Sequence, residues 1–279
     1  MDNKIKKVRL DVYLVENGFF STRQKSQVAI LEGKVFVNNL KEDKPGTLIK
    51  EDAKVEYRGE KLKYVSRGGL KLEKAVQVFN IYLSDKVCID IGSSTGGFTD
   101  LMLQNGAKKV YAVDCGTNQL DYKLRTDDRV VVMENTNARY LSKNDLSDNK
   151  IDFISVDVSF ISLTKIIPVI KEVLDDKGDA VLLIKPQFEA GRELVEKKGV
   201  VRDETTQEKV VRTIIDSCLK DDFIIRGIDF SPIKGPAGNI EYLLYISKNK
   251  NDEGMNIENI DNYIKKLVKM SHDELDKED

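Results

Sequence analysis

The chain of 279 residues has no tryptophan, one histidine and three cysteines. Cys88, Cys115 and Cys218 lie far apart in apolar surroundings, so they provide neither a disulfide framework nor a CxxC metal site, and we expect small core residues. The single His272 stands in an acidic carboxyl-terminal segment. The sequence therefore lacks the base of a Ser-His-Asp or Cys-His mechanism, and it predicts no metal site.

Long apolar runs are also missing. No segment approaches the roughly 20 consecutive apolar residues of a membrane-spanning helix. The first residues, MDNKIKKVRLD, carry positive charge without the apolar region that follows such charges in a signal peptide. We therefore expect a cytoplasmic location and no membrane partner, whereas the sequence leaves the oligomeric state open.

Charge is distributed unevenly, although the net charge is only -2. Residues 1–67 contain 15 Lys and Arg against 10 Asp and Glu, a balance of +5, and residues 249–279 contain 5 against 9, a balance of -4. The amino-terminal segment is thus the better candidate for binding a polyanion, although its excess of positive charge is modest.

The periodicity of hydrophobic residues changes near residue 58. Before it, helical patterns at 9–16 and 21–32 precede strand-like segments at 34–38 and 53–57. After it, strand patterns alternate with helix-length intervals, which predicts an α/β fold with a doubly wound, mainly parallel sheet. Those strand segments are VCIDIG, KVYAVDC, RVVVMEN, DFISVDVS, DAVLLIKP, FIIRGIDF and IEYLLYI.

These patterns divide the chain into four parts. Residues 1–60 form a small α+β domain, 61–67 a linker, 68–248 the sheet domain, and 249–279 an acidic tail with a possible short helix.

The stretch VCIDIGSSTGGFTD, residues 87–100, joins the first strand of the sheet domain to a helix. Gly92, Gly96 and Gly97 let a ligand approach the backbone at the carboxyl end of a strand, where open α/β sheets bind their ligands. A P-loop needs Lys and then Ser or Thr after its last glycine, and the stretch spells neither that motif nor GxGxxG.

The acid inside this stretch, Asp90, favours a ligand that carries positive charge, such as the ammonium and sulfonium groups of S-adenosylmethionine. Asp114 ends the next strand, where an acid commonly accepts hydrogen bonds from ribose hydroxyls. A simpler interpretation is a glycine turn with a helix-capping aspartate.

Three further polar residues lie at strand ends. Asp157 ends FISVDVS, Lys185 ends AVLLIKP and Glu241 begins IEYLLYI. If the last strand is antiparallel to its neighbours, these side chains meet at one edge of the sheet, and Lys71 reaches them from SRGGLKLEKA. A lone lysine is most often a solvated charge, but Lys185 ends an apolar strand.

Long motifs in both halves of the chain resemble the TlyA-type ribosomal RNA methyltransferases, also called the hemolysin A family. That family joins a small RNA-binding domain, like that of ribosomal protein S-four, to an FtsJ-like methyltransferase domain. The resemblance is carried by RLDVYLVENGFFSTRQKSQVAILEGKVFVN, YVSRGGLKL, DIGSSTGGFTD, VDVSFISL, IKPQFEAGRE, KGVVRD and SPIKGPAGNIEYLLY. The chain departs from some members at Tyr64, where they carry tryptophan, and residues 249–279 match no family feature.

The resemblance implies a class I, Rossmann-like methyltransferase that uses S-adenosylmethionine to methylate the 2′-hydroxyl of cytidine ribose in 16S or 23S ribosomal RNA, or in both. It implies a catalytic tetrad of Lys71, Asp157, Lys185 and Glu241, in which Lys185 acts either as a neutral base or as a charged stabiliser. The implied donor site comprises Asp90, Gly92, Ser93, Ser94, Thr95, Gly96, Gly97, Asp114 and Asn137. The partner is ribosomal RNA, naked or within a ribosomal subunit.

The amino-terminal domain supplies candidate phosphate contacts. Arg23 and Lys25 lie near the start of the second helical pattern and Lys34 follows it, and Arg9 and Arg67 complete the set. Paired aromatic residues that would stack exposed bases are missing there, which favours a folded RNA recognised by its shape.

Two other classes of function compete with methyl transfer. A non-catalytic RNA-binding or ribosome assembly factor would keep the amino-terminal domain but has no need of the tetrad. A membrane-active hemolysin needs an amphipathic segment, for which residues 257–270 are the best candidate. Acidic flanks argue against binding to anionic membranes, and such a helical stripe more often packs on its own protein.

Overall fold

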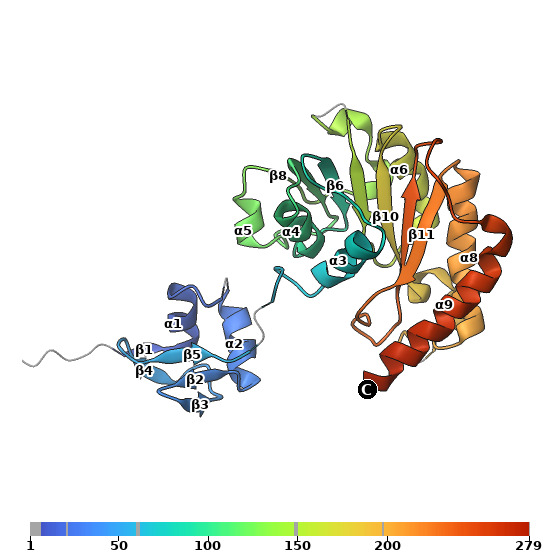
Figure 1. The fold of residues 1–279 in the computed structure, drawn as a ribbon. Coiled ribbons are helices and arrows are strands. Elements are labelled where there is room, and N and C mark those ends of the chain that lie inside the picture. Colours follow the sequence, from blue (N-terminus) through green and yellow to red (C-terminus); the bar gives the residue numbers. More distant parts are fainter. Residues whose placement is uncertain (1–6, 21, 60–61, 148–149, 197, 279) are drawn as a thin grey trace, which may run out of the picture. The chain divides into compact units, whose positions relative to one another are not determined.

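The structure is a computed structural model that describes residues 7–20, 22–59, 62–147, 150–196 and 198–278. The chain divides into two compact units, Met1–Leu62 and Lys63–Asp279 (Figure 1). Residue 21, where the second helix was expected to begin, and residue 61, the first residue of the expected linker, lie outside the described residues.

The first unit packs two short helices on short antiparallel strands. Its core consists of Leu10 and Leu14 from one helix, Ala29 and Ile30 from the other, and buried strand residues such as Val35. Thr22 begins the second helix, because its hydroxyl accepts a hydrogen bond from the Lys25 amide at 3.3 Å. The elements are β1 (Lys7–Arg9), α1 (Leu10–Glu16), α2 (Arg23–Leu31), β2 (Val35–Val37), β3 (Leu40–Glu42), β4 (Leu48–Lys50) and β5 (Val55–Tyr57).

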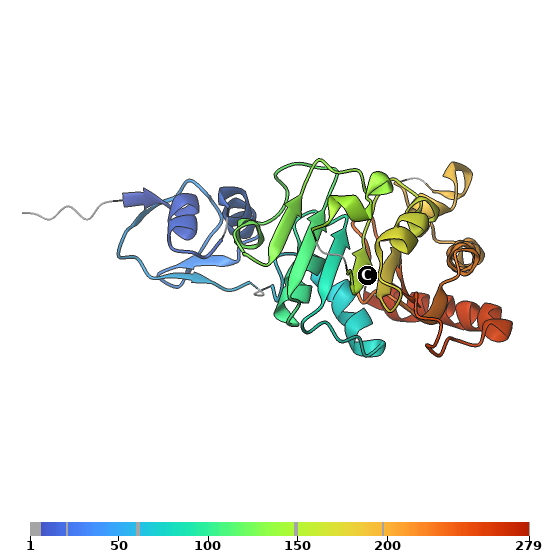
Figure 2. The ribbon, with the colours of Figure 1, turned by 90° about the horizontal axis from the view of Figure 1, so that it is seen from above.

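A seven-stranded sheet forms the centre of the second unit (Figures 1 and 2). Its order is β11-β12-β10-β9-β6-β7-β8, and β12 runs antiparallel to both neighbours whereas the pairs from β10 to β8 are parallel. The strands are β6 (Val87–Ile91), β7 (Lys109–Val113), β8 (Val130–Met133), β9 (Phe153–Val156), β10 (Asp179–Ile184), β11 (Ile224–Phe230) and β12 (Tyr242–Ser247). Each predicted strand segment is present, and the predicted doubly wound α/β fold is confirmed.

The connections reverse direction at β6, because the chain proceeds through β7 and β8 on one side and returns to β9 on the other. In open α/β sheets the ligand binds beyond the carboxyl ends of the strands at such a reversal. This topology places the ends of β6 and β9 at the expected site.

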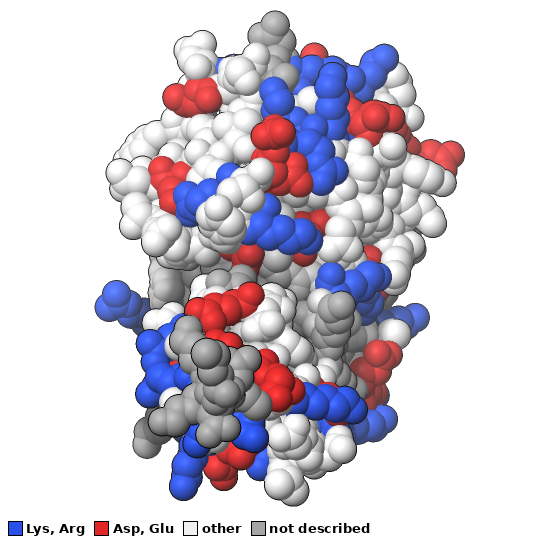
Figure 3. Space-filling model, turned by 90° about the vertical axis from the view of Figure 1, so that its left-hand side faces the viewer, with Lys and Arg blue, Asp and Glu red and all other residues white. Residues whose placement is uncertain are grey.

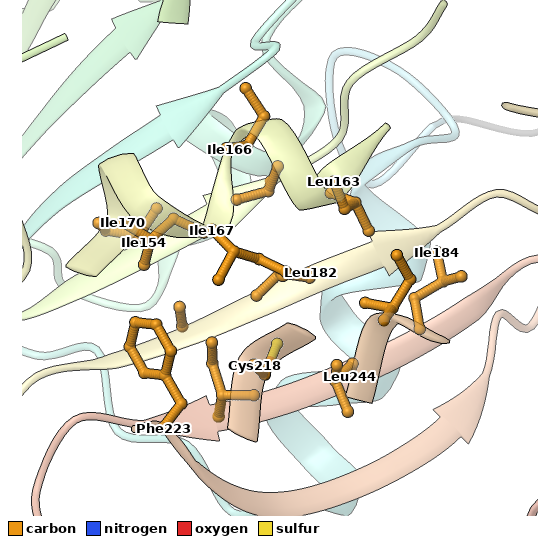
Figure 4. Close-up of a cluster of buried hydrophobic side chains, with 14 of the residues drawn as sticks. Ile154, Leu163, Ile166, Ile167, Ile170, Leu182, Ile184, Cys218, Phe223 and Leu244 are labelled. Carbon is orange, nitrogen blue, oxygen red and sulfur yellow. The ribbon is translucent and has the colours of Figure 1, made fainter. Parts of the chain in front are cut away.

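One face of the sheet is covered by α6 (Ile167–Val173), α8 (Glu204–Lys220) and α9 (Ile260–Leu275). Alternate strand residues point to this face, as Figure 4 shows for Leu182 and Leu244, which lie among Ile167 of α6 and Cys218 of α8. The other face is covered by α3 (Gly69–Val78), α4 (Gly97–Gln104) and α5 (Tyr122–Arg125), and α7 (Pro186–Glu189) follows β10.

Residues 249–279, expected to be an acidic tail with a possible short helix, contain the 16-residue helix α9. Ile260, Ile264, Leu267 and Val268 of this helix are buried in the core of the second unit, and α9 contacts α8 and β11. The amphipathic stripe that the sequence indicated at 257–270 thus packs on its own protein, and the Asp, Glu and Lys residues of α9 are exposed. Among the described residues, none of the helices has the length and apolar character needed to cross a membrane.

Candidate active site

The register of the central strands brings three predicted catalytic residues to one edge of the sheet. β10 and β12 pair antiparallel up to Ile184 and Tyr242, and Lys185 and Glu241 are the next residues at that edge. β9 runs parallel to β10, and Asp157 follows its last residue. Because β12 is antiparallel to β10, its first residue lies at the same edge as the last residues of β9 and β10. This is the arrangement under which the sequence predicted that the three side chains meet.

Lys185 and Asp157 form an ion pair at this edge. The Lys185 Nζ atom lies 2.5 Å from Asp157 Oδ1, and it donates a hydrogen bond to the Ser159 hydroxyl at 3.0 Å. The Lys185 side chain is only 10% exposed, so its charge needs these compensating partners. The pair holds the lysine head at the point where β9 and β10 end.

Lys71 and Glu241 form a second, more deeply buried ion pair. The Lys71 Nζ atom, from the first turn of α3, lies 2.5 Å from Glu241 Oε2, and Glu241 is fully buried. The other oxygen of this carboxylate, Oε1, has no hydrogen-bond partner within the described part of the chain. A buried acceptor without a partner is unfavourable, so Glu241 Oε1 retains an unused capacity to accept a hydrogen bond.

A cavity of about 320 Å³ lies beside the Lys185 pair at the ends of β6 to β9. Its volume falls in the range of roughly 300–1,000 Å³ that is typical of small-molecule sites. Asp157 belongs both to this lining and to the ion pair, so the cavity and the predicted catalytic groups are adjacent. The lining residues include Gly92, Ser94, Asp114, Cys115, Gln119, Thr136, Asn137, Asp157, Ser159 and Phe160.

Asp114 and Asn137 face this cavity from the ends of β7 and β8. The Asp114 carboxylate accepts hydrogen bonds from the backbone amides of Ser94 at 2.8 Å and Gly116 at 2.7 Å, so it joins the loops after β6 and β7. The Asn137 side chain accepts a hydrogen bond from the Arg139 amide at 3.1 Å and caps the 3-10 helix η1 (Ala138–Tyr140). Both side chains that line the cavity are therefore held in place by hydrogen bonds from neighbouring backbone amides.

Gly92 and Ser94, from the turn that follows β6, line both this cavity and a smaller hollow, which Ser93, Thr95 and Gly97 also line. Gly92 has φ +84°, and a Cβ atom there would lie 2.3 Å from the Asp157 carbonyl oxygen. Gly96 has φ +94°, and its amide donates to the Ser93 carbonyl at 2.7 Å. A side chain at Gly92 would collide with the backbone of Asp157, and one at Gly96 would collide with the side chains of Leu124 and Leu120.

Asp90 has the capping role that the sequence offered as the simpler interpretation. Its Oδ2 atom accepts hydrogen bonds from the Thr99 amide at 2.9 Å and hydroxyl at 2.7 Å, and its Oδ1 atom accepts one from Ser155 at 3.1 Å. Burial raises the pKa of Asp90 to about 7, although these hydrogen bonds oppose the shift. Asp90 also lines the smaller hollow beneath the glycine turn.

In the first unit, Arg9 and Arg23 both bind the buried carboxylate of Asp11. Their Nε atoms lie 3.0 Å and 2.8 Å from its oxygens, and Gln27 donates a further hydrogen bond at 2.8 Å. Burial opposes ionisation, but the hydrogen bonds from Arg9, Gln27 and Arg23 outweigh it and lower the pKa of Asp11. About half of each arginine side chain stays exposed, 46% and 52% respectively.

The other predicted RNA contacts are more scattered. Lys25 is exposed on α2, and Lys34 forms a surface ion pair with Glu32 at 2.7 Å. Arg67 is exposed but belongs to the second unit, just before α3. Figure 3 shows Lys and Arg side chains interspersed with Asp and Glu on the drawn face. The distribution of charge on this face therefore does not identify an RNA-binding surface.

Several residues near the cavity were not predicted. Phe160 is 90% exposed, has the left-handed φ of +63°, and contacts the Phe188 ring with centroids 4.9 Å apart. Cys115, expected in the core, is exposed and lines the cavity, because it follows β7 rather than lying within it. The sequence feature that could have identified Ser159 and Phe160 is their position in VDVSF, just after Asp157 at the end of a strand.

Two known families match parts of the chain. One, described as FtsJ-like methyltransferase, matches residues 64–248 and includes all the predicted tetrad and donor-site residues. The other, described as S4 domain, matches residues 8–55 and includes Arg9, Arg23, Lys25 and Lys34.

Two named proteins are similar to most of the chain. "Putative rRNA methyltransferase YqxC" of Bacillus subtilis is 53% identical over 241 residues, which are 86% of each chain. "16S/23S rRNA (cytidine-2'-O)-methyltransferase TlyA" of Mycobacterium tuberculosis is 34% identical over 264 residues, which are 94% of this chain and 98% of that relative.

Solved structures share the fold. A putative hemolysin from Streptococcus thermophilus is 47% identical and superimposes with a TM-score of 0.76 over 98% of both chains. A putative S-adenosylmethionine-dependent methyltransferase from Listeria monocytogenes is 17% identical and reaches a TM-score of 0.50 over 66% of this chain and all of its own. The second likeness concerns the fold alone.

Proposed function

The chain belongs to the FtsJ-like methyltransferase family, and from this premise we propose that it methylates the 2′-hydroxyl of a cytidine ribose in ribosomal RNA, with S-adenosylmethionine as donor. The relative from Mycobacterium tuberculosis, similar over nearly its full length, is named for this reaction in 16S and 23S ribosomal RNA. We place the reaction in the cytoplasm, where ribosomal subunits are found.

The observation that carries the proposal is the adjacency of the cavity and the two ion pairs. Asp157 lines the cavity and binds Lys185 at 2.5 Å, and its backbone lies against Gly92 of the glycine turn. A methyl donor bound in the cavity and a ribose hydroxyl bound at Lys185 would therefore meet beside Asp157. An assembly factor without catalytic activity has no need of this arrangement.

The residues around the cavity fit S-adenosylmethionine. When bound, that molecule supplies a methyl group made electrophilic by the sulfonium. The Asp114 carboxylate suits ribose hydroxyls, Asn137 suits the adenine edge, and Gly92 admits the donor close to the backbone. The acidic lining suits a cationic ligand better than a phosphate.

The tetrad performs the steps that a ribose hydroxyl requires. In the proposed step the hydroxyl oxygen attacks the methyl carbon, the new O–C bond forms as the C–S bond breaks, and the hydroxyl proton passes to a neutral Lys185 amine or, where Lys185 is an ammonium, to solvent. Lys185 binds that oxygen, either as an ammonium that stabilises the developing charge or as an amine that accepts the proton. Asp157 and Ser159 fix its direction, and correct positioning alone lowers the barrier by roughly 7–11 kcal/mol in favourable cases.

Glu241 and Lys71 have a supporting role in the proposal. The free Oε1 atom of Glu241 accepts a hydrogen bond from a ribose hydroxyl, while Lys71 neutralises the carboxylate from the other side at 2.5 Å. In the first unit, Arg9 and Arg23 contact phosphates of the RNA with the exposed halves of their side chains.

The proposal is tested by incubating the protein with labelled S-adenosylmethionine and unmethylated small and large ribosomal subunits, followed by mapping of the modified ribose. We expect label at the 2′-oxygen of cytidine with the wild-type protein and none with Lys185→Ala. Equal labelling by both proteins would remove Lys185 from the mechanism, and no labelling of either subunit or of naked RNA would overturn the proposed function.

A further inference from the structure

Glu134, the residue after β8, binds the loop that follows β7. Its carboxylate accepts hydrogen bonds from three consecutive backbone amides, those of Asn118 at 2.8 Å, Gln119 at 2.9 Å and Leu120 at 3.3 Å. Arg125 of α5 adds an ion pair at 2.6 Å. One side chain thus fixes the whole end of this loop.

The loop that Glu134 holds is part of the cavity wall. Cys115 and Gln119 line the cavity from this loop, and Thr136 and Asn137 line it from the segment that follows Glu134. Glu134 therefore stands between the two loops that form one side of the cavity, and it contacts the backbone of both.

Main-chain hydrogen bonds run between the same two loops. The Asn135 amide donates to the Gly116 carbonyl at 2.9 Å, and the Thr136 amide donates to the Asp114 carbonyl at 2.9 Å. Asn118 and Asn135 have left-handed φ values of +56° and +53°. Asparagine adopts that conformation more readily than most residues, and the hydrogen bond to Glu134 fixes the Asn118 backbone in it.

We infer that Glu134 is a positioning residue for the donor, one that shapes the wall of the cavity without touching the reacting atoms. The inference rests on the proposed function, because it assumes that the cavity binds S-adenosylmethionine. Loss of the carboxylate would leave three amide donors without their acceptor and would release the loop that carries Gln119 and adjoins Asp114. Donor affinity would fall, whereas the groups at Lys185 would be unaffected.

The test compares wild-type protein with Glu134→Ala and Glu134→Gln by calorimetric titration with S-adenosylmethionine and by methyl transfer at saturating donor. We expect the dissociation constant to rise about tenfold for Glu134→Ala and less for Glu134→Gln, which keeps one acceptor oxygen. The kcat at saturating donor and the KM for RNA should stay within about twofold of wild type, a pattern that general destabilisation does not produce.

Asp127→Asn is the matched control. The Asp127 carboxylate also pairs with an arginine, Arg129 at 2.7 Å, and it also accepts a backbone amide, but it holds no residue of the cavity wall. We expect its donor affinity to equal that of wild type.

The outcomes separate this inference from the proposed function. Wild-type protein that does not bind S-adenosylmethionine overturns the proposed function. Wild-type protein that binds it, with unchanged affinity in Glu134→Ala or with a loss of kcat alone, overturns the role of Glu134. If Glu134→Ala does not fold, an unchanged affinity in Glu134→Gln overturns that role in the same way.

Discussion

The carbonyl oxygen of Asp157 lies 2.3 Å from the place where a Cβ atom at Gly92 would stand. The turn after β6 and the end of β9 are therefore packed backbone against backbone. Because Asp157 also pairs with Lys185, a displacement of the turn would move the group that orients this lysine. In the proposed mechanism, this contact would couple donor binding to catalysis.

We predict that Gly92→Ala weakens donor binding and lowers methyl transfer together. The added methyl group meets backbone, which cannot rotate away as a side chain does, and the φ of +84° adds strain. Calorimetry with S-adenosylmethionine and transfer assays measure the two effects. Gly199→Ala is the control, since its φ is +76° but no atom lies within 4 Å of its Cβ position. Equal behaviour of the two variants would contradict the prediction.

Lys185→Ala should bind the donor nearly as well as wild type and lose methyl transfer by orders of magnitude, because Lys185 acts mainly in the transition state. Single-turnover transfer to ribosomal subunits provides the measurement. Lys171→Ala, which removes a surface lysine paired with Asp222 at 3.0 Å, should stay fully active. Donor affinity that falls in parallel with transfer would instead assign Lys185 to the donor site.

Asp114→Ala should lower the affinity for S-adenosylmethionine by roughly 1–3 kcal/mol, through lost charge-assisted hydrogen bonds. Part of this loss reflects the loops, since the Asp114 carboxylate also binds the amides of Ser94 and Gly116. Asp114→Asn keeps one acceptor oxygen, so its affinity for S-adenosylmethionine should lie between those of wild type and Asp114→Ala. Calorimetry decides the matter, and an unchanged affinity would restrict Asp114 to a role in loop structure.

The buried Asp90 should make stability depend on pH in a defined window. Its pKa is about 7 in the folded protein and has an ordinary value of 3.8, so between these values the unfolded chain releases a proton that the folded protein keeps. The contribution of Asp90 to stability is complete below about pH 4 and is lost as the pH rises to 7, with a slope of at most about 1.4 kcal/mol per pH unit.

Asp90→Asn removes this titration. We expect the variant to gain stability relative to wild type as the pH rises from about 4 to 7, and the difference to be constant above that. Denaturant unfolding of both proteins across this range is the measurement. Parallel stability curves would show that Asp90 titrates at its ordinary pKa despite its burial.

A protein truncated to begin at Lys63 should fold and bind S-adenosylmethionine but lose most methylation of ribosomal RNA. The second unit is compact by itself and retains the hydrogen bond from the Val65 amide to Asp100 of α4 at 2.9 Å. The loss should appear as weaker RNA binding with a smaller salt dependence, since each lost phosphate contact reduces the slope by about one. Full methylation by the truncated protein would contradict the role of the first unit.

Much of the fold was predictable because its signal is local. Short runs of mostly apolar residues, separated by helix-length intervals, identify strands that are buried on both faces, and the seven segments correspond to β6 to β12. The resemblance to TlyA-type enzymes, confirmed by the FtsJ-like and S4 matches, rested on seven motifs distributed over both halves of the chain. Position at a strand end was enough to propose Asp157, Lys185 and Glu241.

Other features depend on contacts between distant residues, which periodicity does not encode. In the sequence, Asp11 resembles an exposed acidic residue of a helix. In the structure it is buried and binds Arg9, Arg23 and Gln27. Glu134 looks like an ordinary residue after a strand until the loop before α5 folds back onto it. The apolar stripe of α9 was visible in the sequence, whereas the elements that it packs against, α8 and β11, were not.

The Lys71–Glu241 pair joins residues that are 170 positions apart, and this separation has a consequence for biosynthesis. A nascent chain folds from its amino-terminal end, and the first unit needs no residue beyond Leu62 for its core. β12 is made last of the sheet strands and must insert between β10 and β11, so Glu241 reaches Lys71 only when synthesis is nearly complete. An unfinished chain on the ribosome thus has a folded RNA-binding unit but no assembled tetrad.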